Sequence, residues 1–301
     1  MQGTAIARSI DALLRRHAVA GARRPDVLVG LIGRGIQLSR SPAMHEREAA
    51  RLGLSCAYVL IDFDALNLSD DELPAALDAA TSLGFHGVNV TYPFKQAIMP
   101  LLDEVAQDAA AIGAVNTVVF GARRMGHNTD CWGYAQSFRA AMTGMTLERV
   151  AMFGAGGAGS AVGYALIELG ARHVSVVDPD LARAEALALR FANAGVATLA
   201  AIGSAEDALA AADGVVNTTP VGMAKHPGAP FDIGLLRPSQ WVSDVIYFPQ
   251  ETELLRAARA LGCRTLPGIG MAIGQAARAF ELFTGRSADM AAMAGHFEAA
   301  A

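Results

Sequence analysis

The sequence has few cysteines, and this scarcity excludes two kinds of site. Cys56, Cys131 and Cys263 are scattered along the chain and show no CxxC spacing. That pattern argues against a disulfide framework or a zinc site, and it fits a reducing cytoplasm. No group of histidine, cysteine and carboxylate residues has metal-ligand spacing either, so no metal is expected.

Charge and long apolar runs are also sparse. Charged residues make up 18% of the 301 residues, the net charge is −5, and no Lys/Arg run dominates, so nucleic acid is not an expected partner. No run of 18 or more apolar residues occurs, so neither a transmembrane helix nor a membrane partner is expected. Residues 1–25, an N-terminal extension with helical character, lack the continuous apolar core of a signal peptide. The length of 301 residues suggests one large or two ordinary domains, and a hydrophobic content of 52% argues against disorder.

Two successive α/β series fill the chain. In the first, strands are expected at 27–32, 58–61, 85–90 and 115–120, and helices at 42–52, 73–83 and 95–105. In the second, strands are expected at 150–153, 174–177, 214–217 and 241–245, and helices at 161–169, 181–191 and 271–283. The alternation predicts an α/β fold with largely parallel sheets and helices on both faces. A Gly/Arg turn at 121–126 suggests a domain boundary nearby.

The segment 154–159 has the pattern G-x-G-x-x-G and predicts a dinucleotide site. Its residues are Gly154, Ala155, Gly156, Gly157, Ala158 and Gly159. The segment follows an expected strand and opens an expected helix, where glycines allow a tight turn and close approach of the pyrophosphate. The helix N-terminus offers free N–H groups to the phosphates.

Asp178 indicates which dinucleotide binds. It follows the next expected strand, 19 residues beyond Gly159, where an acidic residue contacts the ribose hydroxyls. A carboxylate there would repel the 2′-phosphate of NADP, at a cost of about 4 kcal/mol for one close pair at intermediate dielectric. Neither Pro179 nor Asp180 supplies an arginine, so NAD is the predicted cofactor.

The segment 89–95, NVTYPFK, places polar groups and a lysine at the end of an apolar run. Asn89 and Thr91 could hold a hydroxylated substrate while Lys95 moves a proton. Taken alone, the segment favours the simpler interpretation of a strand, a proline turn and a solvated lysine. Ser39 and Ser41, two residues apart before an expected helix, could donate to a carboxylate or act as an ordinary N-cap pair.

Seven short motifs in order resemble the shikimate dehydrogenase family, and within it the NAD-dependent quinate/shikimate dehydrogenases. They are LSRSPAMH at 38–45, NVTYPFK at 89–95, GAVNT at 113–117, GHNTD at 126–130, NTTP at 217–220, DVIY at 244–247, and GM at 270–271 with QA at 275–276. The resemblance covers nearly the whole chain and favours the functional interpretation of the lysine and the serines.

The resemblance implies a substrate domain (26–128 plus 269–301), a Rossmann domain (129–268) and oxidation of a ring hydroxyl of shikimate, quinate or both. It implies that Lys95 and Asp130 are the catalytic pair. It implies substrate-binding roles for Ser39, Ser41, Asn89, Thr91, Asn116, Tyr247 and Gln275. Further cofactor contacts are expected from Asn217, Thr218, Thr219, Val245, Gly268 and Met271. Oligomeric state stays open, with a homodimer as one alternative.

Two departures from the family pattern keep the substrate open. NAD-type members often have threonine at the position of Ser41 and histidine near Gly274, which here lacks a side chain. These differences weaken the case for quinate, whereas Asp178-Pro179-Asp180 replaces the NADP-binding Asn-Arg-Thr of biosynthetic members. An enzyme acting on an aminoshikimate and a non-catalytic dinucleotide sensor of the same fold are the other readings. Since Lys95 already supplies a base, the nearby His127 is not our catalytic choice. His45 is expected to be structural or partly exposed, and His86 is expected to pack within the fold.

Overall fold

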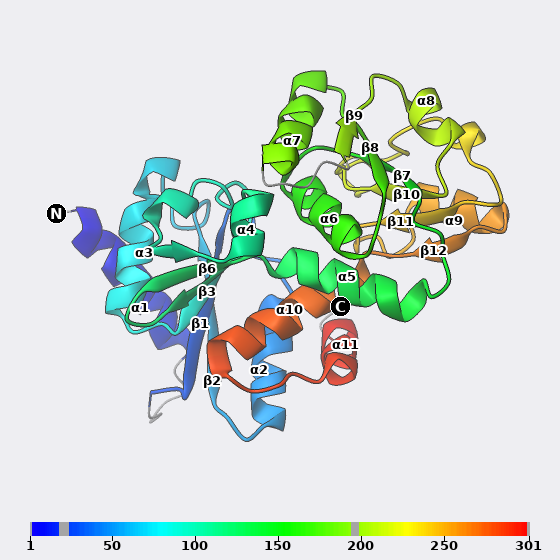
Figure 1. The fold of residues 1–301 in the computed structure, drawn as a ribbon. Helices are drawn as coiled ribbons and strands as arrows, with labels where there is room; N and C mark the ends of the chain where they lie inside the picture. Colours follow the sequence, from blue (N-terminus) through cyan, green and yellow to red (C-terminus); the bar gives the residue numbers. More distant parts are fainter. Residues whose placement is uncertain (1, 18–23, 194–198, 300–301) are drawn as a thin grey trace. The chain divides into compact units, whose positions relative to one another are not determined.

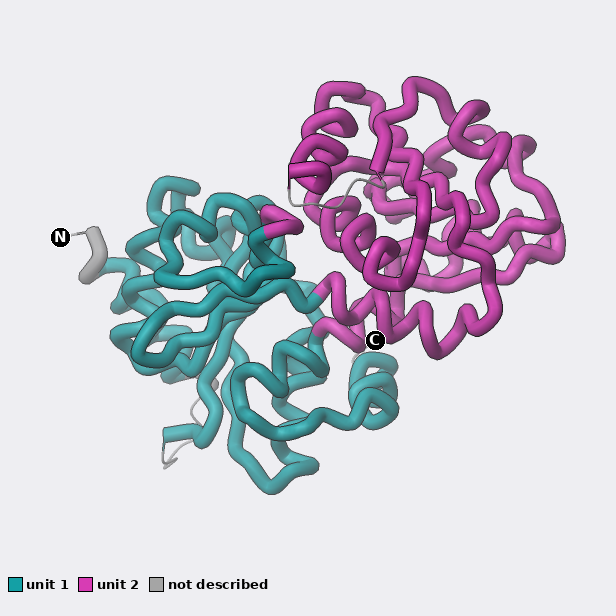
Figure 2. The backbone as a smooth tube through the Cα atoms, viewed as in Figure 1, with its two compact units in different colours: residues 1–110, 114–129, 276–301 teal, residues 111–113, 130–275 magenta. Residues whose placement is uncertain are grey.

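The computed structural model describes residues 2–17, 24–193 and 199–299, and the chain forms two compact units (Figure 2). Unit 1 comprises residues 1–110, 114–129 and 276–301, and unit 2 comprises residues 111–113 and 130–275. The main chain therefore leaves unit 1 after Thr129 and re-enters it after Gln275.

Unit 1 is built on a six-stranded sheet in the order β2-β1-β3-β5-β6-β4 (Figure 1). Its strands are β1 (Val27–Gly33), β2 (Cys56–Asp62), β3 (Gly87–Val90), β4 (Glu104–Val105), β5 (Thr117–Phe120) and β6 (Arg124–His127). The pairs β1–β2, β1–β3 and β4–β6 are parallel, whereas β3–β5 and β5–β6 are antiparallel. All four strands predicted for this part of the chain are present.

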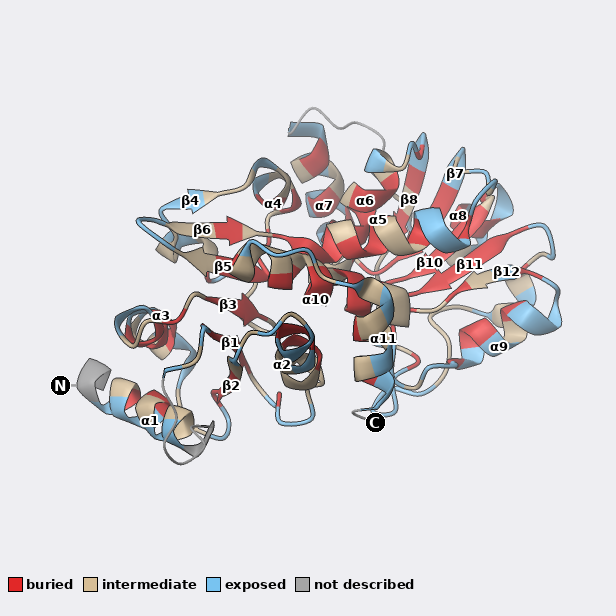
Figure 3. Ribbon diagram, turned by 90° about the horizontal axis from the view of Figure 1, so that it is seen from below, coloured by how far each residue is buried: buried red, intermediate tan, exposed pale blue. Residues whose placement is uncertain are grey.

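Both faces of this sheet are covered, because alternate β1 side chains enter different cores. Leu28 and Ile32 join the core formed with the helices α1 (Gln2–His17) and α3 (Leu73–Ser82). Val29 and Leu31 join the opposite core, which includes Phe283 of α10 (Ile269–Thr284). Burial on both faces explains why β1 is a continuous apolar run, and Figure 3 shows the buried positions along the strands.

Helix α2 (Ser41–Arg51) is tied to the helix α11 (Met290–Glu298) by one buried carboxylate. Glu48 has no exposed surface, and its Oε1 accepts a 2.7 Å hydrogen bond from Asp289 N just before α11. The same carboxylate binds the Arg51 guanidinium at 2.8 and 2.9 Å. These bonds satisfy a charge that would otherwise be costly to bury.

The prediction of a helix at 95–105 is wrong. That segment forms successive turns, the short 3₁₀ helix η2 (Met99–Leu101) and the strand β4. Pro100 lies near the start of η2, and a proline in the interior of an α-helix removes a hydrogen bond and clashes with the preceding turn. The α-helix in this region is α4 (Gln107–Ile112), which follows β4.

The turn at 121–126 joins the two strands of a β-hairpin, and the division between the units lies a few residues beyond it. Only three residues separate β5 from β6, too few for a crossover, so the two strands pair antiparallel. The division between the units falls after Thr129. This hairpin is the reason that the sheet of unit 1 is mixed.

Unit 2 is a doubly wound parallel sheet in the order β12-β11-β10-β7-β8-β9. Its strands are β7 (Arg149–Phe153), β8 (His173–Val177), β9 (Leu199–Ala201), β10 (Gly214–Asn217), β11 (Trp241–Asp244) and β12 (Arg264–Leu266). The other elements of the chain are α5 (Thr129–Ala141), α6 (Gly157–Glu168), α7 (Leu181–Asn193), α8 (Ala205–Ala210), α9 (Glu253–Ala260), η1 (Asp70–Glu72) and η3 (Ile233–Leu235). The α/β fold class with mostly parallel sheets is confirmed. Within the described residues, no helix is both long and apolar enough to cross a membrane.

Candidate active site

A cluster of buried polar side chains lies within unit 1. Tyr58 of β2 has no exposed surface, and its hydroxyl donates a 2.8 Å hydrogen bond to Asn89 Oδ1 on β3. Asn89 Nδ2 donates to Thr117 Oγ1 at 2.9 Å. Burial raises the pKa of the Tyr58 phenol, and a hydrogen bond with the Ser41 side chain partly offsets that rise. The fold thus brings Ser41, Asn89 and Tyr58 together, although sequence reasoning missed Tyr58.

Asn116 extends this cluster to the start of α5. Its Oδ1 accepts a 2.8 Å hydrogen bond from Thr129 N, and its Nδ2 donates to Thr129 Oγ1 at 3.0 Å. Asn116 is 3% exposed, and these hydrogen bonds hold its amide in place. Asn128, the residue before Thr129, donates from Nδ2 to Ala114 O at 2.9 Å. The motif GHNTD therefore holds Thr129, the first residue of α5, within unit 1.

These two amides retain some hydrogen-bonding capacity for a ligand. A side-chain amide offers two N–H donors and two acceptor lone pairs. In the described network, Asn116 Nδ2 donates one bond, and Asn89 Oδ1 accepts one bond. One donor on Asn116 and one lone pair on Asn89 are therefore available, and both suit the hydroxyl groups of a polyol.

Neither Ser39 nor Ser41 is the N-cap residue of α2. The N-cap residue is Arg40, and it makes no side-chain capping bond. Ser41 is the first residue of the helix, and its N–H donates to Ser39 Oγ at 3.3 Å. The N-cap alternative is therefore wrong, and both hydroxyls remain candidates for binding an anion at the start of the helix.

The turn that carries Lys95 is anchored on both sides. Phe94 is 1% exposed, and its ring packs against Phe63 with a centroid distance of 4.5 Å. Val115 N donates a 2.8 Å hydrogen bond to Lys95 O, one residue before Asn116. The half-buried Lys95 is thus neither a fully solvated residue nor on a free loop.

Thr91 belongs to the same turn and lies directly against β1. Its N–H donates to Ile32 O at 3.0 Å. A Cβ placed on Gly33 would lie 2.4 Å from Thr91 Cγ2, so only glycine leaves room for this side chain. Thr91 is half-buried beside the strand end, and its role in substrate binding stays a prediction.

Asp130 lies in the first turn of α5 and is 8% exposed. A carboxylate at this position is favoured by the positive end of the helix dipole. The preceding residue, Thr129, is the last residue of its segment of unit 1 and donates its N–H to Asn116 Oδ1. The pairing of Asp130 with Lys95 stays a prediction.

The glycine-rich loop of unit 2 can only be built from glycine at two positions. Gly154 has φ +103°, in the left-handed region that other residues avoid. A Cβ on Gly159 would lie 2.1 Å from Gly154 O. The helix α6 begins at Gly157 without a side-chain cap on Gly156. This loop is therefore a narrow cradle with uncapped N–H groups, which fits the pyrophosphate of a dinucleotide.

Asp178 is bound to this loop. Its Oδ2 accepts a 2.8 Å hydrogen bond from Ala155 N, and its Oδ1 accepts a 3.0 Å bond from Asp180 N. Sequence reasoning missed Arg183 in the first turn of α7, whose Nη2 lies 3.4 Å from where a Cβ on Gly156 would be. The sequence signal for Arg183 is its position in the first turn of the helix that follows Asp178. One carboxylate and one guanidinium thus flank the cradle.

Asn217 and Thr218 organise the loop edges through their own side chains. Thr218 Oγ1 donates to Phe153 O at 2.7 Å and lies 2.9 Å from Gly154 O. Asn217 Oδ1 accepts from Thr219 Oγ1 at 2.7 Å, and its Nδ2 donates to Asp244 Oδ1 at 3.1 Å. Burial raises the pKa of Asp244, and hydrogen bonds from Ile246, Thr252 and Asn217 counteract that rise.

The remaining predicted residues of unit 2 follow β11 and β12. Val245 N donates to Asn217 O at 3.0 Å, which joins this turn to the β10 edge. A Cβ on Gly268 would lie 2.2 Å from Val245 O, so the two backbones are in close contact. Met271 is 9% exposed, whereas Tyr247 is 47% exposed. Gln275 Nε2 donates to Ala272 O of its own helix at 3.1 Å.

Gly274 has a structural reason to lack a side chain. A Cβ at Gly274 would lie 2.8 Å from Gly133 Cα on α5, and a Cβ at Gly133 would lie 2.6 Å from Gln275 N. The helices α5 and α10 therefore cross backbone to backbone. The histidine expected near this position in some relatives cannot fit at Gly274 without moving a helix.

Three histidines have structural surroundings. His45 is 1% exposed, lies 4.8 Å from the Tyr58 ring, and burial lowers its pKa to about 3. His86 Nδ1 accepts a 3.0 Å hydrogen bond from Leu28 N. His127 lies on β6, and burial lowers its pKa. Among the described residues, no group of three or more His, Cys, Asp and Glu side chains could hold a metal ion.

The parallel sheet and the glycine-rich loop of unit 2 define a dinucleotide-binding α/β protein. Unit 1 adds a cluster of buried polar side chains. Residues 31–118 match the shikimate dehydrogenase substrate binding domain, and residues 268–295 match the shikimate 5′-dehydrogenase C-terminal domain. The chain is 50% identical to a quinate/shikimate dehydrogenase (NAD(+)) of Corynebacterium glutamicum, over 89% of this chain and 96% of the relative. It is 53% identical to a shikimate dehydrogenase (NADP(+)) of Streptomyces avermitilis, over 87% and 91%.

A solved structure agrees with these sequence relatives. Quinate dehydrogenase from Corynebacterium glutamicum in complex with NAD matches with a TM-score of 0.88 at 48% identity, over 91% of this chain and 99% of that one. The chain belongs to the shikimate dehydrogenase family, so the family predicted from the seven motifs is confirmed.

Proposed function

We propose that the protein is an NAD-dependent dehydrogenase that interconverts shikimate and 3-dehydroshikimate, and quinate and 3-dehydroquinate. The observation that carries this proposal is the buried amide and hydroxyl cluster of unit 1, fixed beside Lys95. Val115 N donates a hydrogen bond to Lys95 O, which ties the lysine to the residue before Asn116. The Asn116 side-chain amide has one N–H that can still donate to a ligand. Family membership and the relatives' names support the reaction.

Unit 1 would bind the acid, as the substrate domain. We assign the substrate carboxylate to Ser39 and Ser41, which precede and open α2 and neither of which is its N-cap residue. We assign the ring hydroxyls to Asn89, Thr91 and Asn116. Buried hydroxyls without partners cost about 1–3 kcal/mol each, so a polyol needs several such groups. Tyr247 and Gln275 of unit 2 complete the proposed set.

Unit 2 would bind the dinucleotide, whose pyrophosphate suits the cradle at 154–159. We assign the adenosine ribose to Asp178 and the neighbouring surfaces to Asn217, Thr218, Thr219, Val245, Gly268 and Met271. Asn217 and Thr218 act by shaping the loop, because their side chains already bond within it. When bound, NAD supplies the hydride acceptor.

Two residues would handle the proton. Lys95, in its neutral form, takes the proton of the substrate hydroxyl on Nζ as the carbon loses hydride, which lowers the barrier to oxidation. Asp130 orients that hydroxyl and stabilises the protonated Lys95. Since both roles follow from position and charge, each is testable by a single substitution.

The choice of NAD over NADP rests on Asp178 rather than on the relatives, whose names include both cofactors. A negative carboxylate that already bonds the loop opposes a 2′-phosphate. Arg183 is the observation that favours the second candidate, an enzyme that also accepts NADP, because its guanidinium lies beside Gly156. The ratio of kcat/KM for NAD and NADP decides between them.

The test is turnover by the purified full chain. NAD with shikimate, and NAD with quinate, should each give reduced nicotinamide absorbance at alkaline pH. Absence of signal with both acids would overturn the proposal, and signal with one alone would restrict it to that acid.

The cysteines Cys56, Cys131 and Cys263 are free in the structure, which suits our placement of the enzyme in the cytoplasm.

A further inference from the structure

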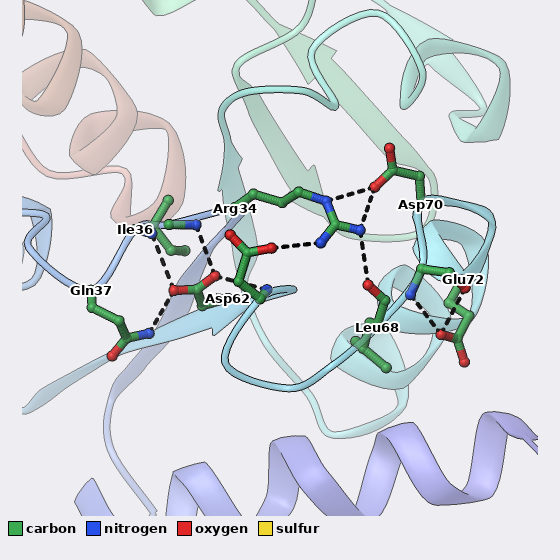
Figure 4. Close-up of polar contacts among 10 residues, drawn as sticks. Arg34, Ile36, Gln37, Asp62, Leu68, Asp70 and Glu72 are labelled. Atoms are coloured by element: carbon green, nitrogen blue, oxygen red, sulfur yellow. Dashed lines mark hydrogen bonds and ion pairs between the residues drawn. The ribbon is translucent and has the colours of Figure 1, made fainter. Parts of the chain in front are cut away.

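Asp62 is a buried carboxylate of unit 1 that accepts four hydrogen bonds, three of them from one loop. It ends β2 and is 1% exposed. Its Oδ1 accepts from Gly35 N at 3.0 Å and Asp64 N at 3.1 Å, and its Oδ2 accepts from Ile36 N at 3.1 Å and Gln37 Nε2 at 2.8 Å (Figure 4). Three of these donors belong to residues 35–37, between β1 and α2.

The same loop leads directly to the serines. Ile36 N bonds to Asp62, and Ile36 O accepts a 2.9 Å hydrogen bond from Ser39 N. Ser39 Oγ in turn accepts from Ser41 N at 3.3 Å. An unbroken series of hydrogen bonds therefore runs from the carboxylate of Asp62 through Ile36 and Ser39 to Ser41.

Among the described residues, no arginine forms an ion pair with Asp62, although Arg34 lies nearby. The Arg34 guanidinium binds Asp64 at 2.7 Å, Asp70 at 2.6 Å and Leu68 O at 2.8 Å instead (Figure 4). Burial raises the pKa of Asp62, but the bonds from Gln37, Asp64, Gly35 and Ile36 outweigh it, so the pKa is lowered overall. Only an ionised carboxylate can accept from all four donors, because a protonated acid or an amide would turn a hydrogen toward one of them.

We propose that Asp62 is a positioning residue that sets the geometry of Ser39 and Ser41 for the substrate carboxylate. It acts through the backbone of residues 35–39 and does not touch the substrate. This inference rests on the proposed function, in which the two serines bind the acid.

The test compares Asp62→Asn with the wild-type enzyme. Asparagine keeps the size but replaces one oxygen by an NH₂ group, which opposes two of the four donors. The KM for the acid should rise roughly tenfold, the size of effect expected when hydrogen bonds to a charged group are lost. Values of kcat and of the KM for NAD should stay within about twofold, because the serines bind the acid and not the hydride acceptor.

Asp64→Asn is the matched control. Asp64 is close in sequence, but its side chain is 57% exposed and binds Arg34 at the outer side of this network. Its backbone N–H, which donates to Asp62, is retained in the variant. An exposed ion pair contributes little, so the KM for the acid should not change. Equal KM values for the two asparagine variants would overturn the inference.

Gln37→Ala keeps the test decisive if Asp62→Asn does not fold. It removes one side-chain donor to Asp62 and leaves the backbone donors in place. The KM for the acid should rise about two- to threefold, as for loss of one modest hydrogen bond. An unchanged KM for Gln37→Ala in that case contradicts the inference.

A double-mutant cycle with Ser41→Ala separates this inference from the proposed function. Ser41→Ala alone should raise the KM for the acid, and no rise would refute the carboxylate role of Ser41 itself. If Ser41→Ala raises the KM and Asp62→Asn does not, only the positioning role fails. If Asp62 acts through the serines, the effect of Asp62→Asn should shrink in the Ser41→Ala background. Full additivity of the two effects on the KM would contradict the positioning role of Asp62.

Discussion

Asp178 Oδ2 accepts a 2.8 Å hydrogen bond from Ala155 N, so the acidic residue after β8 is part of the glycine-rich loop itself. Its second oxygen accepts from Asp180 N, which directs the carboxylate at the cradle. The residue that is proposed to select the cofactor is therefore held in place by the loop that is proposed to bind it. Loop geometry and cofactor choice should change together when Asp178 changes.

Asp178→Ala should weaken the preference for NAD. The substitution removes the negative charge that opposes a 2′-phosphate and also the partner of Ala155 N. We expect kcat/KM for NAD to fall about tenfold or more. The ratio of kcat/KM for NAD to kcat/KM for NADP should fall by a larger factor, because a close pair of like charges costs about 4 kcal/mol before screening. Steady-state kinetics with both cofactors measure this ratio. Asp180→Ala is the control, and an unchanged ratio for Asp178→Ala would mean that the carboxylate does not select the cofactor.

Tyr58→Phe tests the polar cluster of unit 1. Loss of the hydroxyl leaves Asn89 Oδ1 without its 2.8 Å donor, so the amide is free to change its orientation. The KM for the acid should rise roughly three- to tenfold, as expected when the free energy of one hydrogen bond is lost from binding. The KM for NAD should not change. Tyr134→Phe removes the hydroxyl of another fully buried tyrosine, in unit 2, and should leave the KM for the acid unaltered. Equal effects of the two substitutions would argue against a role of the cluster in substrate binding.

The sequence predicted the repeating parts of the fold because they depend on local patterns. Apolar runs and a glycine motif between strand and helix place β7, α6 and Asp178 without reference to distant residues. The segment 95–105 has a pattern that suits a helix, but Pro100 limits the helical structure there to a short 3₁₀ turn. The antiparallel β5–β6 hairpin is not predicted, because the alternation of strands and helices indicates only parallel pairing.

The candidate site shows the same limit. Asn89, Asn116 and Ser41 could be named from motifs, but the buried hydroxyl of Tyr58 could not, because its partner is 31 residues away. Similarly, the absence of a side chain at Gly274 looked like a departure in the substrate pocket. Only the crossing of α5 and α10 shows that Gly133 leaves no room there.

Gly274→His should therefore disrupt the protein rather than create quinate preference. A Cβ at this position would lie 2.8 Å from Gly133 Cα, and backbone cannot yield as a side chain can. Overpacking typically costs about 1–3 kcal/mol and occasionally more, so the melting temperature should fall by several degrees. Thermal unfolding followed by circular dichroism tests this, with Gly295→Ala as a control where a Cβ meets nothing within 4 Å. A stable Gly274→His variant would show that the helices can separate.

His45 should make the protein less stable as the pH falls below neutrality. Burial lowers the pKa of His45 from 6.5 to about 3, so between these values the unfolded chain binds a proton that the native chain does not. Unfolding free energy from this residue should fall by about 1.4 kcal/mol per pH unit below 6.5, or about 2 kcal/mol at pH 5. His45→Phe should remove this contribution to the pH dependence.

Urea unfolding at pH 7 and pH 5 measures the difference between the two proteins. The comparison uses the change with pH rather than the absolute stability, since phenylalanine also alters packing against Tyr58. Replacement of the exposed His173 by alanine is the control. The same pH dependence in wild type and His45→Phe would show that His45 takes up its proton in the native state.

The most direct test of the account is the turnover of Lys95→Ala beside Lys225→Ala. The chain contains only these two lysines, and Lys225 is exposed on unit 2. With saturating NAD and acid, Lys95→Ala should lose about 10²-fold or more in kcat because no base takes the hydroxyl proton, while calorimetry shows that the acid still binds. Lys225→Ala should retain the wild-type rate. Wild-type turnover by Lys95→Ala would contradict the central claim that Lys95 is the proton acceptor.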